Sequence, residues 1–176
     1  MNDTAKATPT SAAHTRKVAY AVVLVAIGVA LAPYTSFPIG VAKVNPTQHF
    51  INVISAVILG PWWAVLTALV IGIIRNALGV GTLLAFPGGM IGALLAGLMF
   101  AWRRNLSLAA AGEIVGTGLL APVVSALWVA PVFMGQAIPY LALVPSFLAS
   151  TVAGALLGVL ALKFLQRADI VDIAGR

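Results

Sequence analysis

Cysteine is absent from the 176 residues, and only four side chains are acidic. The lack of cysteine excludes disulfide bonds, thiolate nucleophiles and cysteine-ligated metal sites. The two histidines, His14 and His49, form no metal-ligand cluster. The sequence also lacks a phosphate-binding loop, an H-E-x-x-H helix and a G-x-S-x-G turn. We therefore expect no catalytic residue, no metal and no cofactor, and the chain is not predicted to be an enzyme.

Charged residues of both signs are scarce, at 8% of the chain against 61% hydrophobic residues. So few charges cannot cover the surface of a water-soluble protein of this size. The apolar runs are long enough to cross a bilayer core of ~30 Å and lack the alternation of a β-barrel. Because backbone polar groups at that depth must be satisfied within the chain, the spanning segments are helices. The sequence predicts an all-α membrane protein, and its net charge of +6 does not indicate nucleic-acid binding because the basic residues lie at helix ends.

Prolines, basic residues and the lengths of the apolar runs predict six transmembrane helices. We expect them at about 17–32, 48–60, 62–78, 87–102, 107–129 and 140–164. The first helix is predicted to stop at Pro33, which cannot continue the hydrogen-bond ladder. Ser107 is the expected N-cap of the fifth helix, and Pro122 an expected kink within it. The first run is as short as a signal-peptide core, but we interpret it as a retained helix.

The basic residues also predict the topology. They gather at the amino end, in the connection after the fourth helix and at the carboxyl end, so both termini are expected in the cytoplasm. Residues 1–15 are expected to form a disordered cytoplasmic tail, 16–167 the transmembrane domain, and 168–176 a second cytoplasmic tail. Lys43 and Arg75 do not follow the rule, which suggests that they serve another purpose.

Two connections on the outer side are unusual. Residues 33–47 are too long and too rich in proline for a bare turn, and we interpret them as an external lid that carries one charge, Lys43. The second connection, Arg75–Gly89, joins a guanidinium, an amide and a hydroxyl to a double-glycine turn and a Pro-Gly-Gly helix start. A simple linker between helices would not need these groups, so this stretch is predicted to form part of a binding site.

Glu113 is expected about 15 Å inside the membrane, since it lies nine residues beyond Arg104 at 1.5 Å per residue. We expect it to face Arg75 across the bundle interior, directly or through ligand or water. A cavity role is typical of ionisable residues at this depth. The alternative is a buried ion pair that only fixes the register of two helices.

Further polar side chains complete the candidate site. Gln48, Asn52 and Ser55 share one helix face, which predicts either a cavity wall or interhelical hydrogen bonds. A few polar anchors among apolar and aromatic walls are typical of a site for a small, mostly uncharged heteroaromatic ligand. The predicted substrate-binding residues are Lys43, Gln48, His49, Asn52, Arg75, Asn76, Thr82, Phe86, Glu113 and Thr117.

The first helix carries two pairs of small residues, Ala26 with Ala30 and Gly28 with Ala32. Such pairs allow close approach between helices in lipid. Spacing alone favours internal packing for both pairs.

Three motifs together resemble the ThiW-type substrate-binding (S) component of energy-coupling factor (ECF) transporters. They are Asn45–Ile54, Gly60-Pro61-Trp62-Trp63 and the Arg75–Gly89 connection, and the segment Glu113–Gly118 fits the same family. The resemblance implies a six-helix S-component bundle in a prokaryotic plasma (inner) membrane. It implies that the protein captures hydroxyethylthiazole, a thiamine precursor, from outside. The partners it implies are a transmembrane coupling subunit, met through Ala26 and Ala30, and two ATPase subunits.

Other functions remain open from the sequence. The same scaffold serves thiamine, its pyrimidine precursor and other vitamins. A stand-alone facilitator or channel, and a structural subunit without a ligand, are further alternatives.

Overall fold

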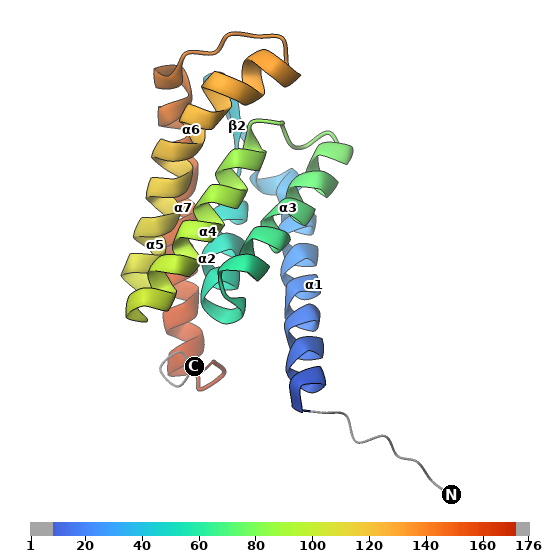
Figure 1. Ribbon diagram of the computed structural model, residues 1–176, viewed down its shortest axis with the longest axis vertical. Helices are drawn as coiled ribbons and strands as arrows, with labels where there is room; N and C mark the ends of the chain where they lie inside the picture. Colours follow the sequence, from blue (N-terminus) through green and yellow to red (C-terminus); the bar gives the residue numbers. More distant parts are fainter. Residues whose placement is uncertain (1–8, 172–176) are drawn as a thin grey trace, which may run out of the picture.

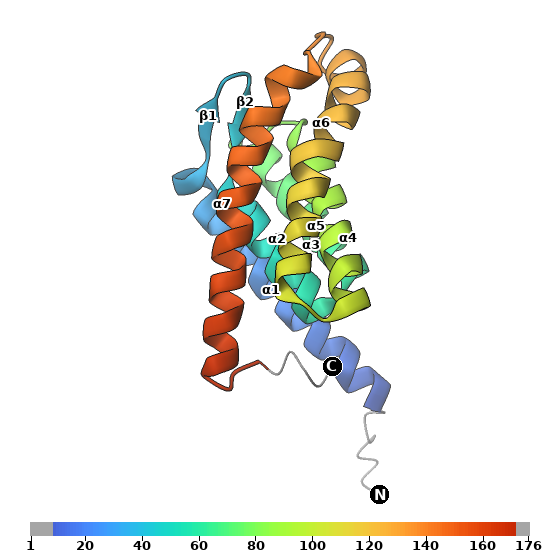
Figure 2. The same cartoon turned by 90° about the vertical axis from the view of Figure 1, so that its left-hand side faces the viewer.

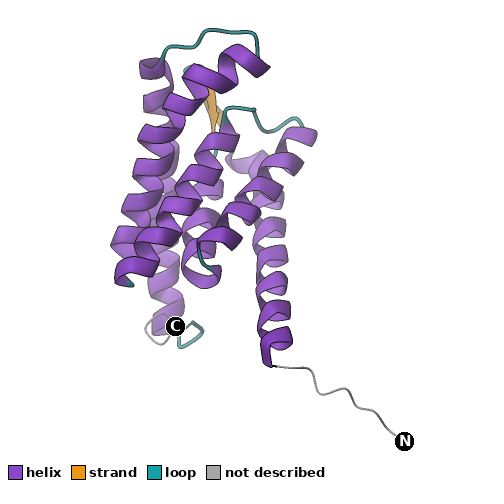
Figure 3. Ribbon diagram, in the orientation of Figure 1, coloured by secondary structure: helices purple, strands orange, loops and turns teal. Residues whose placement is uncertain are grey.

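The computed structural model describes residues 9–171, and its regular secondary structure is helical apart from one short hairpin (Figures 1 and 3). In chain order the elements are α1 (Pro9–Thr35), β1 (Phe37–Ile39), β2 (Ala42–Val44), α2 (Pro46–Leu59), α3 (Pro61–Ala77), α4 (Ala85–Arg103), α5 (Leu106–Val115), η1 (Gly116–Leu120), α6 (Ala121–Val124), η2 (Ser125–Phe133) and α7 (Tyr140–Arg167). The four elements from α5 to η2 form one continuous helix, Leu106–Phe133. The described residues therefore form six helices.

Four of these helices are long and apolar enough to cross a membrane: Ala12–Thr35 within α1, then α4, Leu106–Phe133 and α7. Helices α2 and α3 are apolar but shorter, with 14 and 17 residues. At 1.5 Å per residue they extend about 21 and 26 Å, less than a bilayer core of about 30 Å. The all-helical, apolar character agrees with the predicted class, while the number of spans and the topology stay predictions.

Helix α2 is the centre of the bundle. It packs against α1, α3, α4, α5 and α7, and lies behind α4 in Figure 1 and behind α7 in Figure 2. Eleven of its 14 residues are buried, including polar Gln48, His49 and Asn52. Since all sides of α2 meet protein, its polar side chains must find partners on neighbouring helices.

Glycine permits the closest helix contacts. A Cβ on Gly154 of α7 would lie 2.2 Å from the carbonyl oxygen of Pro46, at the start of α2. A Cβ on Gly112 would lie 2.6 Å from the carbonyl oxygen of Leu95, and one on Gly116 would lie 2.8 Å from Gly92 Cα. These contacts bring the backbones of α2 and α7, and of α4 and α5, together.

Two predicted ends of α1 were wrong. The helix continues through Pro33 to Thr35, because proline removes only one donor from the ladder. The last turn is closed by hydrogen bonds from Thr35 Oγ1 to Leu31 O and from Ser36 N to Ala32 O, both 3.0 Å. At the other end, residues 9–15, which we expected in a disordered tail, are helical. Residues 1–8 and 172–176 of the predicted tails lie outside the described residues.

The fifth helix also differs from its prediction. Its N-cap is Asn105, whose side-chain oxygen accepts from Ser107 N at 2.8 Å and Leu108 N at 3.2 Å, so Ser107 is not the cap. The helix continues past its predicted end at residue 129, through Pro131, and ends at Phe133. Wide π turns at η1 and η2 accompany Pro122 and Pro131, where the usual ladder is interrupted.

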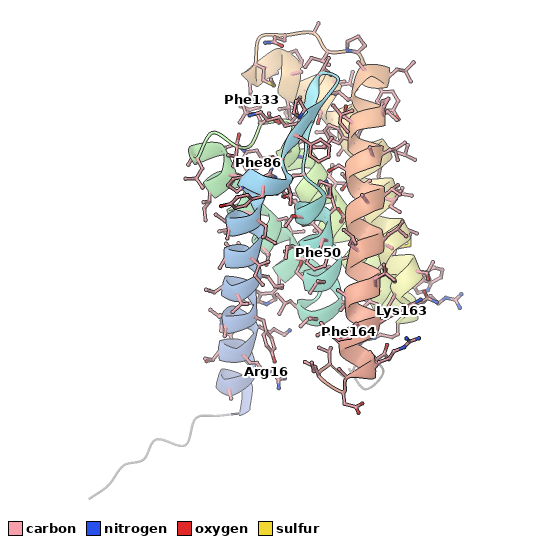
Figure 4. The ribbon with its side chains drawn as sticks, turned by 180° about the vertical axis from the view of Figure 1, so that it is seen from behind. Arg16, Phe50, Phe86, Phe133, Lys163 and Phe164 are labelled. Atoms are coloured by element: carbon pink, nitrogen blue, oxygen red, sulfur yellow. The ribbon has the colours of Figure 1, made fainter. Side chains whose placement is uncertain are left out.

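The two ends of the bundle differ, since one carries basic side chains and the other carries the hairpin. Arg16 and Lys163 lie at the end where α1 begins and α7 finishes (Figure 4). The hairpin of β1 and β2 covers the opposite end and lies against the upper half of α7 (Figure 2).

The Gly154 contact can be tested by substitution. Gly154→Val should lower the thermal unfolding midpoint of the purified protein, because overpacking a tight contact costs about 1–3 kcal/mol. The neighbouring exposed Ala153→Val is the matched control and should leave the midpoint nearly unchanged. Equal midpoints for the two variants would contradict the close approach of α2 and α7.

Candidate functional site

A cavity lies beneath the hairpin, between α2, α3, α4, η1 and α7. Its wall is formed by Ala42, Lys43, Val44, Asn45, Gln48, His49, Arg75, Thr82, Leu84, Ala85, Gly88, Thr117, Ser146, Phe147 and Ser150. The volume open to the centre of a water molecule is about 30 Å³. One ordered water needs ~10–15 Å³ on this measure, so the closed cavity has room for about two waters. A larger ligand requires the hairpin or the wall side chains to move.

Arg75 occupies the last turn of α3 and is only 2% exposed. Its Nη1 donates to Gln48 Oε1, and its Nη2 donates to Ser36 Oγ at 3.2 Å. The amide nitrogen of Gln48 donates in turn to Ala68 O at 3.4 Å, which turns the amide oxygen toward Arg75. Arg75 Nε has no hydrogen-bond partner in the described part of the chain. The guanidinium is thus held by neutral groups, and one of its nitrogens, Nε, makes no hydrogen bond to them.

Glu113 is fully buried behind the cavity wall. Its Oε1 accepts hydrogen bonds from His49 Nδ1 at 2.8 Å and Asn52 Nδ2 at 3.0 Å. Thr117 Oγ1 lies 3.0 Å from the same oxygen and 2.8 Å from Gly88 O, and its single proton can be donated to either. The carboxylate is therefore bound to α2 through two residues one turn apart.

Gly92 of α4 makes room for this group. A Cβ at Gly92 would lie 2.1 Å from Thr117 Oγ1 and 2.7 Å from each oxygen of Glu113. Close backbone approach is the reason that glycine fits here.

Arg75 and Glu113 do not form a direct ion pair. Within residues 9–171 the ionisable side chain that contacts Glu113 is His49, with 2.8 Å between His49 Nδ1 and Glu113 Oε1. Gln48 contacts Arg75 and the next residue, His49, contacts Glu113, so α2 lies between the two ionisable groups. The sequence analysis included His49 but did not assign it to Glu113, although His49 and Asn52, at i and i+3 on one helix face, could have suggested that pair.

The amino end of α2 is fixed by Asn45. Its Oδ1 caps the helix by accepting from Gln48 N at 2.8 Å, ahead of Pro46 at the first helical position. Its Nδ2 donates to Ser36 Oγ at 2.7 Å, and its backbone N donates to Ser150 Oγ at 2.9 Å. This one residue therefore joins α2 to the end of α1 and to α7, and directs Gln48 and His49 into the site.

The hairpin closes the cavity. Phe37 pairs with Val44, and Ile39 with Ala42, across the turn at Gly40, whose φ of +57° favours glycine. Ser146 Oγ of α7 donates to Ile39 O at 2.6 Å, and Lys43 Nζ donates to Gly79 O at 3.3 Å. These bonds connect the predicted lid to α7 and to the turn after α3.

Six of the ten predicted binding residues lie in the cavity wall: Lys43, Gln48, His49, Arg75, Thr82 and Thr117. The other four lie outside it. Asn52 and Glu113 belong to the network behind His49. Asn76 donates to Gly72 O at 2.9 Å and Thr82 O at 3.4 Å, so it braces the turn after α3. Phe86 packs against α3 at Gly72.

The sequence analysis missed several polar residues of the site: Ser36, Asn45, Ser146 and Ser150. Asn45 was detectable, since Asn followed by Pro is a helix-start signature. The serines gave no such signal, because serines on apolar helices are common and their roles depend on tertiary packing.

The two small-residue pairs of α1 face opposite ways. Gly28 and Ala32 are buried, and a Cβ on Gly28 would lie 2.7 Å from Ile71 Cδ1. Ala26 and Ala30 are exposed and line an apolar groove between α1 and α3. Internal packing therefore explains the first pair and not the second.

An apolar helical bundle with a cavity of polar and apolar side chains at one end is typical of a membrane-embedded protein that handles a small molecule. The family model of the thiamine-precursor transporter protein (ThiW) matches residues 18–168, and the chain belongs to that family. No curated protein matches the chain. The family is one of transporters, which is consistent with the prediction that the chain is not an enzyme.

A double-mutant cycle tests the contact between Glu113 and His49. Glu113→Gln and His49→Ala should each lower the unfolding midpoint, since breaking a buried pair costs about 3–5 kcal/mol. Their combination should cost less than the sum, because contacting residues couple. In the comparison cycle, Glu113→Gln and Arg75→Gln should be additive to within about 0.5 kcal/mol, since these side chains do not touch. Coupling of Glu113 to Arg75 and not to His49 would contradict the observed arrangement.

Proposed function

We propose that the protein is the substrate-capture subunit of an ECF-type importer for a thiamine precursor. The cavity beneath a hairpin, at the end away from the basic helix ends, carries this proposal. By the positive-inside rule the basic end is cytoplasmic, so the cavity faces the outside, where a scavenged nutrient arrives. The six helices span a prokaryotic plasma membrane with both termini inside.

Hydroxyethylthiazole is the proposed ligand. Apolar Leu84, Ala85 and Phe147 offer contacts to a thiazole ring, and Gln48 and Arg75 offer hydrogen bonds to a hydroxyl group. Thiamine itself fits less well, because it is larger and carries a fixed positive charge. That charge would meet Arg75 and Lys43 in a wall that has no acidic residue.

Ligand entry needs the hairpin to open. The hydrogen bonds from Ser146 and Lys43 that hold the hairpin are few and lie at its edges. A bound ligand replaces the lost contacts with its own, so it stabilises the closed state by its differential affinity.

Energy for uptake comes from partner subunits, since the chain has no phosphate-binding loop of its own. We assign the contact with the transmembrane coupling subunit to the exposed groove of Ala26 and Ala30, where small side chains permit close helix approach. Two ATPase subunits complete the importer.

Direct binding tests the proposed function. The full-length protein in lipid nanodiscs is titrated by calorimetry with hydroxyethylthiazole, the pyrimidine precursor and thiamine. Hydroxyethylthiazole should bind with a Kd below about 1 μM, equivalent to about −8 kcal/mol, and more tightly than the other two. Binding of none of the three would overturn the assignment. Downhill transport by proteoliposomes that contain this chain alone would indicate a facilitator instead.

The coupling groove has a separate test. Ala26→Leu with Ala30→Leu should reduce cellular uptake at least about tenfold, because bulky side chains prevent close helix approach, while the ligand affinity of the purified protein should stay unchanged. Ala19→Leu is the matched control, because Ala19 is exposed on α1 but does not line the groove. Normal uptake by the double variant would exclude this groove as the coupling contact.

A further inference from the structure

Arg75 has no acidic partner in the described part of the chain. Residues 9–171 contain two acids, Glu113 and Asp169. Glu113 is held by His49 at 2.8 Å. Asp169 comes two residues after Arg167, the last residue of α7, and that end of α7 lies opposite the hairpin (Figure 2). The guanidinium, 2% exposed, is bound only by the neutral side chains of Gln48 and Ser36.

A buried cation without a counter-ion is unfavourable, and neutral hydrogen bonds compensate only in part. Inside membrane proteins such groups mark sites or pathways. Arg75 still has one donor, Nε, without an acceptor among the described residues. Because a guanidinium presents several N–H groups in one plane, its best complement is a carboxylate or a phosphate.

The rest of the wall has the same sign of charge. Lys43, on β2 of the hairpin, lines the same cavity and donates to a neutral carbonyl, Gly79 O, at 3.3 Å. The wall contains these two basic residues and no acidic one. Hydroxyl groups of Thr117, Ser146 and Ser150 add neutral hydrogen-bonding partners. The cavity is therefore complementary to negative charge.

We propose that the cavity binds its ligand best when the ligand carries an anionic group, either a carboxylate or a phosphate monoester. The anion becomes the counter-ion of Arg75, and Lys43 closes over it with the hairpin. This inference rests on the proposed function, because it places the anionic group on the thiazole unit. The neutral alcohol uses the same guanidinium through weaker hydrogen bonds.

Four ligands separate charge from shape in calorimetry on the full-length protein in nanodiscs. They are hydroxyethylthiazole, its phosphate monoester, the corresponding thiazole acetic acid, and the neutral methyl ester of that acid. At least one anion should bind about tenfold more tightly than the alcohol and the ester, since charge-assisted hydrogen bonds are about twice as strong as neutral ones. The two anions distinguish a phosphate site from a carboxylate site. The advantage should decrease as salt screens the exposed Lys43.

Substitutions test whether Arg75 and Lys43 cause the preference for an anion. Arg75→Gln should remove the preference for the anion, and Arg75→Lys, which keeps the charge but not the planar donors, should retain part of it. Lys43→Gln should weaken the binding of the anion more than the binding of the alcohol. Because Lys43 is exposed, this variant provides a test even if Arg75→Gln does not fold. Lys163→Gln makes the same charge change at the opposite end and is the matched control.

The outcomes distinguish this inference from the proposed function. If the alcohol binds at least as tightly as both anions, the proposed preference for an anionic ligand is wrong, whereas the proposed capture of a neutral precursor is retained. If none of the four compounds binds, the proposed function itself fails. An anion preference that survives Arg75→Gln and Lys43→Gln would place the anion elsewhere and overturn the assignment.

Discussion

The buried carboxylate of Glu113 is the constraint on which the rest of the structure depends. Because Glu113 is fully buried, its carboxylate needs hydrogen-bond donors from the protein. His49 and Asn52 provide them from α2, and Thr117 lies one turn along from Glu113 on its own helix. This requirement fixes α2 in rotation and depth, and it needs Gly92 on α4 to leave space. The central helix, the tight α4–α5 contact and the wall of the cavity all follow from it.

The same constraint separates two kinds of polar residue in the bundle. Glu113 and Asn52 bind each other behind the cavity wall and join α5 to α2, although Glu113 Oε2 and Asn52 Oδ1 have no hydrogen-bond partner among the described residues. Arg75, Gln48 and Lys43 form the cavity, where partners are incomplete or lie at its edge. His49 belongs to both groups, since its Nδ1 contacts Glu113 while its side chain lines the cavity. A change at His49 therefore affects stability and ligand contact together.

Much of the fold could be predicted because the apolar runs and their breaks dominate the sequence. The predictions of helix ends were wrong where neighbouring hydrogen bonds outweighed the local effect of one residue. Pro33 did not stop α1, because the neighbouring bonds from Thr35 and Ser36 were enough to close the turn. Arg75 and Glu113 stood out in the sequence by their rarity, but the sequence could not show that α2 lies between them. That arrangement depends on helix rotation, which one-dimensional spacing does not specify.

The short helix α3 has a consequence for how the bundle sits in lipid. Its 17 residues extend about 26 Å, whereas the 28 residues of α7 extend about 42 Å at 1.5 Å per residue. Both helices expose leucines to the surroundings, Leu66 on α3 and Leu156 on α7. The apolar belt is thus of unequal height around the protein, and a bilayer of uniform thickness cannot match both sides at once. Thinning and tilting each cost only fractions of a kcal/mol per Å of mismatch. Lipid around helices of such unequal length has to thin, or the bundle has to tilt, before both apolar surfaces are covered.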